Sequence, residues 1–218
     1  MEPALSLVDA SAGYAGRPVL HGVTLTLRRG ERVSVLGKSG SGKPTLLGLA
    51  YSRLAGEAAL VPQAAALVRP LSVFHNVYMG RLDRHSTLRN LAMLAWPRRA
   101  EVEAVRATLG AVHLADEIFA RAGALSGGQQ QRVSVARALY SGRPIAIGDE
   151  PVSALDPVQA ADVLRSMAAR HDTLLLAMHD VGLALAFSDR IVMLAAGRMV
   201  LDAPTHDLSA ERLRDFYA

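Results

Sequence analysis

The chain has 218 residues, of which half are apolar and one fifth charged, and it contains no cysteine. This excludes disulfide frameworks, thiolate metal sites and cysteine nucleophiles, and the length is sufficient for one domain with a sizeable core. The formal net charge of +4 is compatible with a nucleotide or a membrane-surface partner, but no run of Lys and Arg exceeds two residues, so we expect no nucleic-acid partner. We also expect no secretory signal and no membrane-spanning helix, since no stretch reaches the ~18 apolar residues that a spanning helix needs.

Short β-like runs alternate with helical patterns, which is typical of a mainly parallel sheet with crossover helices. Strands are predicted at residues 5–8, 23–27, 32–36, 145–147 and 173–177. The last two are continuous apolar runs of the kind that is buried on both faces of a sheet. The turn at Gly197-Arg198, between the apolar runs 191–194 and 199–201, predicts a hairpin. We therefore expect an α/β fold with a single domain over residues 1–218.

The chain between the third predicted strand and the strand at 145–147 is helical in pattern. Helices with an apolar spacing near 3.6 residues are predicted at 71–82, 101–109 and 128–140. Pro70 and Pro97 stand at expected helix starts. We interpret roughly residues 65–140 as a mostly helical insertion in the α/β core.

A glycine-rich loop follows the third predicted strand and opens an apolar helix that begins near Lys43. This strand–loop–helix context is what a phosphate-binding P-loop requires. The glycines let successive backbone N–H groups converge on phosphate, the helix N-terminus adds positive potential, and the Lys43 ammonium reaches the terminal phosphates. The candidate nucleotide-binding residues of this segment are Gly37, Ser39, Gly40, Ser41, Gly42, Lys43, Pro44 and Thr45.

Pro44 departs from the P-loop pattern, which has Ser or Thr after the lysine to bind Mg²⁺ through its hydroxyl. Proline has neither a hydroxyl nor an N–H, so the loop loses a metal ligand and a phosphate donor. Its place in the first helical turn makes it sterically acceptable, although it biases Lys43 away from helical φ and ψ. The neighbouring Thr45 is a candidate substitute, but its side chain is expected on another face of the helix.

A second motif lies far along the chain, where Leu125-Ser126-Gly127-Gly128-Gln129 precedes a predicted helix, and Asp149-Glu150 ends the predicted strand at 145–147. Together with the P-loop, these residues resemble the nucleotide-binding subunits of ATP-binding cassette (ABC) transporters over nearly the whole chain. In that family the five-residue run is the signature motif. The resemblance implies a P-loop NTPase core and a helical subdomain that carries the signature motif. Because only 20 residues separate Lys43 from Gln63, we expect an abbreviated antiparallel β-subdomain.

The resemblance also implies roles for single residues. Tyr14 is implied to stack on adenine, although a lone tyrosine before a strand is equally a core or surface residue. Gln63 is implied to contact metal and water, and His179 to contact the γ-phosphate. The remaining implied nucleotide contacts are the signature residues Ser126, Gly127, Gly128 and Gln129 and the D-loop residue Asp156.

Two carboxylates supply the implied chemistry, with ATP and Mg²⁺ as cofactors. Asp149 follows a buried strand, where open α/β sheets bind ligands, and is expected to hold Mg²⁺ directly or through water. Glu150 is expected to orient and deprotonate the attacking water. Catalysis is then mainly electrostatic positioning of an in-line water. In the family two copies sandwich two ATP molecules, so Ser126 of one chain is implied to face the phosphate held by Lys43 of the other.

The resemblance further implies a homodimer that docks on separate integral membrane permease subunits, with a solute-binding protein in the full system. This places the chain in the cytoplasm, peripheral to the membrane. A partial similarity to phosphonate-type importers favours import of a small polar or anionic solute. The candidate permease contacts are Phe74, Tyr78, Met79 and Trp96, for which ordinary packing in the helical insertion is an equally open interpretation.

Two other functions stay open. Pro44 favours a regulatory or degenerate nucleotide-binding module with weak or no turnover, but Gln63, Asp149, Glu150 and His179 are all intact. The other alternative is a non-transport ATPase of DNA repair or translation. Such proteins usually have two cassettes or long insertions, and the sequence has neither.

Overall fold

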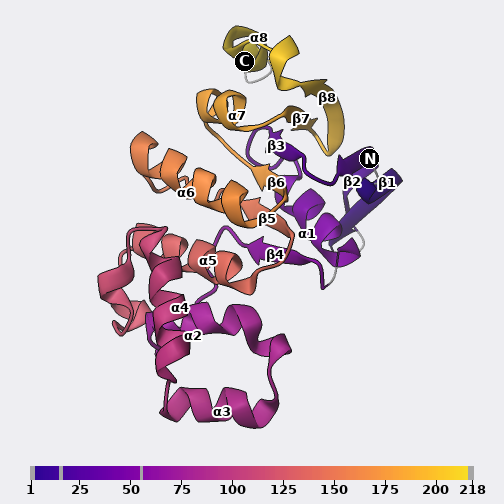
Figure 1. The fold of residues 1–218 in the computed structure, drawn as a ribbon. Coiled ribbons are helices and arrows are strands. Elements are labelled where there is room, and N and C mark those ends of the chain that lie inside the picture. The colour runs from indigo at the N-terminus through magenta and orange to yellow at the C-terminus, as the bar shows by residue number, and fades with distance from the viewer. Residues whose placement is uncertain (1–2, 15–16, 55, 216–218) are drawn as a thin grey trace.

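A six-stranded sheet in the order β4-β5-β6-β3-β7-β8 forms the centre of the fold, as the computed structural model of residues 3–14, 17–54 and 56–215 describes it (Figure 1). Its strands are β3 (Arg32–Leu36), β4 (Ala58–Val61), β5 (Ile145–Asp149), β6 (Thr173–Ala177), β7 (Arg190–Ala195) and β8 (Arg198–Pro204). All neighbours are parallel except β7 and β8, which form the predicted hairpin. The strands predicted at 32–36 and 173–177 are confirmed with the same bounds, and the sequence prediction lacked β4.

A separate two-stranded antiparallel sheet consists of β1 (Pro3–Tyr14) and β2 (Arg17–Arg28). Both strands extend well beyond the predicted 5–8 and 23–27, because the register shifts around Asp9 and Gly22, which both have positive φ, let the pairing continue past an irregularity. Between Arg53 and Ala58 the described residues form turns and no strand. Among the described residues, the separate antiparallel sheet thus consists of β1 and β2 alone, which agrees with the abbreviated β-subdomain expected from the short spacing.

Helices cover both faces of the large sheet and form a separate helical segment. The helices of the core are α1 (Lys43–Arg53), α6 (Pro157–Arg170), α7 (Val181–Phe187) and α8 (Ala210–Asp215), with a short 3₁₀ turn, η4 (Thr205–Asp207). The helical segment contains α2 (Val73–Tyr78), η1 (Met79–Arg84), α3 (Thr87–Ala95), α4 (Arg99–Gly110), η2 (Ala115–Glu117), η3 (Ala122–Ala124) and α5 (Gly127–Ser141). Within the described residues, no helix is both long and apolar enough to cross a membrane.

The helix predicted at 71–82 is wrong in extent. It begins after Ser72, whose hydroxyl caps the first turn, and its α-helical part ends at Tyr78. A 3₁₀ turn continues to Arg84, because Gly80 packs so closely on α5 that a Cβ there would lie 2.4 Å from the Arg137 carbonyl oxygen. Helix α3, which the sequence prediction lacked, begins after a second serine cap at Ser86.

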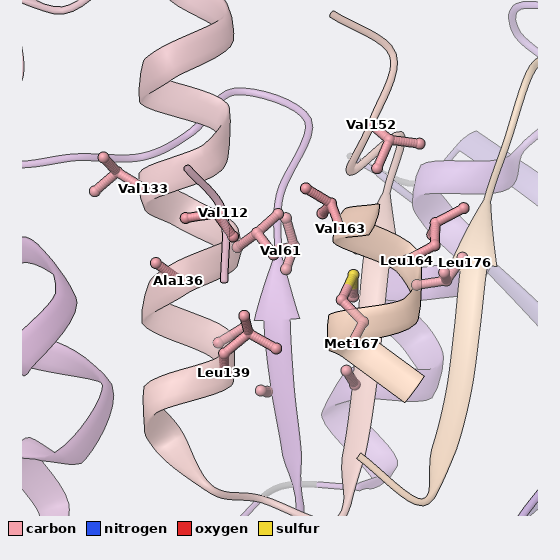
Figure 2. Packing of buried hydrophobic residues seen from close by; sticks show 14 of the residues in the cluster. Val61, Val112, Val133, Ala136, Leu139, Val152, Val163, Leu164, Met167 and Leu176 are labelled. Atoms are coloured by element: carbon pink, nitrogen blue, oxygen red, sulfur yellow. The ribbon is translucent and has the colours of Figure 1, made fainter. Parts of the chain in front are cut away.

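Two apolar clusters occupy the two faces of the large sheet. One joins the inner faces of α5 and α6 to the sheet, and Figure 2 shows Leu139, Leu164 and Leu176 within it. The other packs α1 and the β1–β2 sheet against the opposite face, with Leu25 and Leu46 fully buried. Each such leucine contributes about 1.5–3 kcal/mol relative to exposure, so the sheet is a rigid platform for the loops at its ends.

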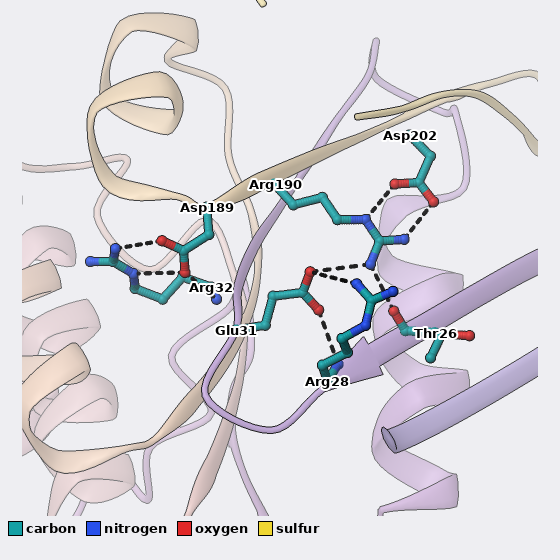
Figure 3. Close-up of polar contacts among 7 residues, drawn as sticks. All are labelled: Thr26, Arg28, Glu31, Arg32, Asp189, Arg190 and Asp202. Atoms are coloured by element: carbon teal, nitrogen blue, oxygen red, sulfur yellow. Dashed lines mark hydrogen bonds and ion pairs between the residues drawn. The ribbon is translucent and has the colours of Figure 1, made fainter. Parts of the chain in front are cut away.

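A charged cluster fixes the β7–β8 hairpin on the core (Figure 3). Arg190 forms two hydrogen bonds of 2.5 Å with Asp202 and a 3.3 Å ion pair with Glu31. Arg32 pairs with Asp189 at 2.6 Å. Because the opposite end of this hairpin contacts the glycine-rich loop, the cluster helps to hold the loop's surroundings in place.

Candidate functional site

The glycine-rich loop connects β3 to α1 in a conformation that depends on glycine. Gly37, Gly40 and Gly42 have φ values of 150°, 78° and 104°. A Cβ on Gly37 would lie 2.4 Å from the carbonyl oxygen of Leu194 on β7, so no other residue fits there. The turn of the β7–β8 hairpin and this loop line a cavity of about 350 Å³. Positive-φ glycines before a helix N-terminus are the backbone that the predicted phosphate site requires.

Lys43 starts α1 and folds back over the loop. Its ammonium donates to the carbonyl oxygen of Gly37 at 2.6 Å and is buried. Burial lowers the pKa of the Lys43 ammonium, and the carboxylates of Glu150 and Asp149 act in the opposite direction. The ammonium therefore lies in a poorly solvated position in which an anionic phosphate is a stronger partner than a carbonyl oxygen.

Pro44 is accommodated in the first turn of α1 without disturbing the helix. The first intrahelical bond joins the N–H of Leu46 to the carbonyl of Gly42, so the missing N–H of Pro44 costs no helical hydrogen bond. The Pro44 ring is exposed, whereas Thr45 is buried on another side of the helix. The Pro44 and Thr45 side chains thus face different surroundings.

Parallel pairing brings three predicted site segments to the same edge of the sheet. Val61 of β4 is in register with Gly148 of β5, and Asp149 is in register with Ala177 of β6. Gln63 therefore follows β4 at the edge where Asp149 ends β5 and where His179 follows β6. The Gln63 side chain is exposed there. This is the edge where open α/β sheets bind their ligands.

Glu150 and His179 are in direct contact. The Nε2 atom of His179 lies 2.5 Å from Oε1 of Glu150, and the Glu150 side chain is 12% exposed while that of His179 is 48% exposed. Glu150 has a left-handed φ of 54°, and its N–H donates to the carbonyl of Ala177. Such a conformation in a non-glycine residue costs free energy and is typical of functional sites. It aims the carboxylate at the histidine of the neighbouring strand end.

Asp149 is buried without a complete set of partners. Its Oδ1 atom has no hydrogen-bond partner among the described residues. Burial raises the pKa of the Asp149 carboxyl and repulsion from Glu150 raises it further, against the attraction of Lys43 and His179. An orphaned buried carboxylate oxygen fits a cation. Among the described residues, no group of three or more His, Asp or Glu side chains is placed to hold a metal ion.

The signature motif lies at the start of α5, where Ser126 and Gly127 are exposed and Leu125 is buried. The Ser126 hydroxyl accepts from the N–H of Gln129, whose side chain in turn accepts from the N–H of Ser126, which forms a capping box. Gly127 is exposed and Gly128 half-buried, and a Cβ on Gly128 would lie 3.3 Å from the carbonyl oxygen of Ala154 in the D-loop. None of these residues lines the cavity at the glycine-rich loop of the same chain.

Two further predicted contacts differ in their surroundings. Asp156 caps α6, because its Oδ1 accepts from the N–H groups of Val158 and Gln159 at 3.0 Å each. Tyr14 ends β1 and is 65% exposed. The adjoining start of β2 reaches the glycine-rich loop, since a Cβ on Gly42 would lie 2.8 Å from the Leu20 side chain. Tyr14 thus presents an exposed aromatic face.

Three polar side chains form hydrogen bonds with the backbone on both sides of Gln63. The sequence prediction did not assign this role to them. Arg137 of α5 donates to the carbonyls of Ala66 and Ala65 at 2.9 and 3.2 Å, and Gln131 donates to that of Pro62 at 3.4 Å. Asn76 of α2 closes the same segment through both backbone groups of Val68. Burial lowers the pKa of the Arg137 guanidinium. No local pattern in α5 singles out Gln131 or Arg137 for this role.

The expectation that Phe74 and Tyr78 contact a partner protein is wrong. Phe74 is fully buried, and Tyr78 is 3% exposed with its hydroxyl donating to Asn90. Both pack inside the helical segment, where Phe74 stacks on Tyr78. Met79 is half-buried, and Trp96 is 81% exposed. An amphipathic pattern alone does not tell an inner from an outer apolar face.

Comparison with known proteins gives one family throughout. Residues 20–153 match the sequence profile "ABC transporter". The phosphonates import ATP-binding protein PhnC of Anaeromyxobacter dehalogenans is 37% identical over 99% of this chain, which spans 48% of that protein. The protein of the same name from Caulobacter vibrioides is 35% identical, and the chain spans 94% of it.

Solved structures of the same family have the same fold. A dimeric bacterial ABC transporter cassette superposes with a TM-score of 0.80 at 24% identity, over 92% of this chain and 98% of its own. A bacterial Atm1-family ABC exporter with ATP bound superposes with a TM-score of 0.76 at 27% identity, over 96% of this chain and 39% of its own.

Proposed function

Because this chain belongs to the ABC transporter family, as an ATP-binding domain, we propose that it hydrolyses Mg-ATP at a homodimer interface to drive solute import through a separate permease. The observation that carries the proposal is the sheet edge. There the glycine-rich loop, the orphaned Asp149 carboxylate and the Glu150–His179 pair lie together. These are an anion site, a cation ligand and a candidate base within one region.

The residues divide the work as follows. ATP supplies the phosphoryl group, and Mg²⁺ supplies positive charge that neutralises the phosphates. The loop amides and Lys43 bind and orient the phosphates, and Asp149 holds the metal. Glu150 accepts a proton from the attacking water, and His179 orients the Glu150 carboxylate through the 2.5 Å contact between Nε2 and Oε1. Gln63 follows the adjacent strand and contributes to the metal and water positions.

A second copy completes the site. The exposed N-terminus of α5, with Ser126, Gly127 and Gly128, does not line its own chain's phosphate cavity. A helix N-terminus carries partial positive charge and is a fitting donor to phosphate from across an interface. Gln129 and Asp156 support this geometry as helix caps, and Tyr14 offers its exposed ring to the adenine base.

The transported solute is proposed from the relatives. Proteins named for phosphonates import are 35–37% identical to this chain over 99% of its length. We infer that the chain serves import of a phosphonate or a similar small anion. In this proposal it works in the cytoplasm beneath integral permease subunits and receives solute through a binding protein. It needs no nucleic-acid partner.

Pro44 supports a second candidate, a cassette that binds nucleotide with weak or no turnover. The exposed Pro44 ring has no oxygen to offer, and Thr45 faces the interior. Asp149 is then the main protein ligand of the metal, and Mg²⁺ binds less tightly than in a site with a serine hydroxyl.

The test is ATP-dependent dimerisation of the full chain, measured by size-exclusion chromatography with and without Mg²⁺, together with phosphate release. Glu150→Gln removes the base but keeps the shape, so it is expected to trap an ATP-bound dimer, while Glu103→Gln on exposed α4 serves as control. A dimer with no phosphate release from the wild type favours the second candidate. The proposed function is contradicted if neither the wild-type chain nor Glu150→Gln binds ATP.

A further inference from the structure

Another cavity lies next to the Glu150–His179 pair, between helices α6 and α7. Its volume is about 540 Å³, against about 350 Å³ for the cavity at the glycine-rich loop, and none of its lining residues belongs to that loop. The space stays open because small residues line it, namely Ala160 on α6 and Gly182 and Ala186 on α7. A concave site of several hundred Å³ is typical of the binding of small organic molecules.

The walls of this cavity are mainly apolar, and hydrogen bonds fix them in place. Met178, at the end of β6, is a buried part of the wall. The N–H and the hydroxyl of Ser153 both donate to the carbonyl of Glu150, at 3.3 and 3.2 Å, which fixes the turn before α6. On the other side, the Asp180 carboxylate accepts from the N–H of Leu183 at 2.8 Å and fixes the start of α7. Walls that are already ordered lose little entropy when a ligand binds.

The charge around this cavity is negative. Glu150 and Asp180 line it, and no Lys or Arg is among the described residues that do so. An ammonium group has three N–H donors and pairs well with carboxylates, so these surroundings favour an organic cation over an organic acid. A phosphate group is repelled here, which distinguishes this cavity from the glycine-rich loop.

We propose that the cavity between α6 and α7 binds a small amphiphilic cation, with its apolar body between the helices and its amine at Glu150 and Asp180. Such a ligand pairs with the carboxylate that the proposed function uses as the base. It therefore inhibits phosphate release and leaves the glycine-rich loop open to nucleotide. The inhibition rests on the proposed function, whereas the binding rests on the cavity alone.

The test measures binding of dansylcadaverine to the full chain without nucleotide. This probe is a naphthalene that an alkyl chain joins to a primary amine, and its fluorescence rises in apolar surroundings. Dansyl-aminohexanoate, which has a carboxylate in place of the amine, is the matched twin. The amine is expected to bind with a Kd below about 100 μM and at least about tenfold more tightly than the twin.

Two variants locate the bound probe. Ala186→Arg puts a long cationic side chain at an exposed position of the cavity and is expected to weaken amine binding at least about tenfold. Ala169→Arg makes the same change at an exposed position of α6 outside the cavity and leaves binding unchanged. Asp180→Asn keeps an oxygen for the N–H of Leu183, so α7 keeps its cap, and the loss of charge is expected to weaken amine binding about threefold.

The contrary outcomes are distinct. Equal binding of the two probes, no binding of the amine at millimolar concentration, or unchanged binding by Ala186→Arg overturns the proposal. A nucleotide-free dimer in size-exclusion chromatography that Ala186→Arg dissociates overturns it in favour of a second copy as the occupant.

A fluorescent ATP analogue separates this proposal from the proposed function. Retained analogue binding with slower phosphate release in the presence of the amine supports inhibition at Glu150. Displacement of the analogue by the amine places the amine in the nucleotide site and overturns the proposal. Failure of the wild-type chain to bind the analogue without the amine counts against the proposed function alone, since amine binding is measured without nucleotide.

Discussion

Asp149→Asn is expected to stabilise the nucleotide-free chain and to remove its stabilisation by Mg-ATP. Asp149 is 8% exposed on β5, and its Oδ1 atom has no hydrogen-bond partner among the described residues. Burial and the adjacent Glu150 both raise the pKa of the Asp149 carboxyl. The folded chain therefore holds a charge that the unfolded chain would solvate better.

The sign and size of the effect follow from this environment. A carboxyl whose pKa is raised on folding destabilises the folded state above that pKa, and the penalty fades as pH falls through it toward the unfolded value. An unsatisfied buried polar atom costs about 1–3 kcal/mol. Since asparagine loses the charge but keeps a polar group, we expect a gain of about 1–2 kcal/mol. For a chain of this length that is an increase in Tm of about 2–8 °C.

Thermal unfolding at neutral pH without nucleotide measures the gain, and Asp172→Asn, at an exposed aspartate, is the control. The gain of Asp149→Asn is expected to shrink as the pH falls and the wild-type carboxyl takes up its proton. Adding ATP with Mg²⁺ is expected to raise the Tm of the wild type and not that of Asp149→Asn. A lower Tm for Asp149→Asn than for the wild type, both without nucleotide, would refute the reasoning that the unpartnered Asp149 carboxylate opposes folding.

Three further substitutions test other parts of the site. Pro44→Ser is expected to lower the Mg²⁺ concentration needed for binding of a fluorescent ATP analogue about tenfold, and an unchanged Mg²⁺ titration contradicts the missing-ligand argument. Arg137→Met is expected to lower the free energy of unfolding by about 2–4 kcal/mol and to change the Mg²⁺ titration in the same way as Gln63→Ala, with partial rescue by Arg137→Lys. A loss of stability with an unchanged Mg²⁺ titration means that Arg137 has a structural role and does not position Gln63. Arg190→Met leaves Asp202 unpaired and is expected to cost about 1–3 kcal/mol in urea unfolding, and a stability equal to the wild type contradicts the structural importance of this pair.

Much of the parallel sheet was predictable because its strands are buried on both faces. The run 173–177 is almost entirely apolar, the run 32–36 is apolar apart from Arg32 and Ser34, and the structure has strands with the same bounds. The break after Tyr78 was not predictable, because the apolar pattern continues through it. Only the tertiary contact between Gly80 and the backbone of α5 ends the α-helix there. Local pattern decides the element type, and packing decides where the element ends.

The site was predictable as a set of motifs, but its contacts were not. The spacing of the glycine-rich loop predicts a phosphate site from local sequence alone. The contact between Glu150 and His179 needs β5 and β6 in register, with 28 residues between the two in the chain. Arg137 reads as a polar residue of α5, and only the folded chain brings the carbonyls of Ala65 and Ala66 within its reach. Such long-range partners leave no local signal.

The energetically unfavourable features at the sheet edge all destabilise the nucleotide-free chain. Asp149 holds an orphaned acceptor, Glu150 has a left-handed backbone, and Lys43 lies in surroundings that lower its pKa. Each feature opposes folding of the nucleotide-free chain, and a ligand with anionic oxygens and a bound cation would give partners to Lys43 and Asp149. Pro44, by contrast, costs the helix no hydrogen bond. The sequence thus keeps the strained groups that a nucleotide would relieve, which argues for retained nucleotide binding whatever the turnover.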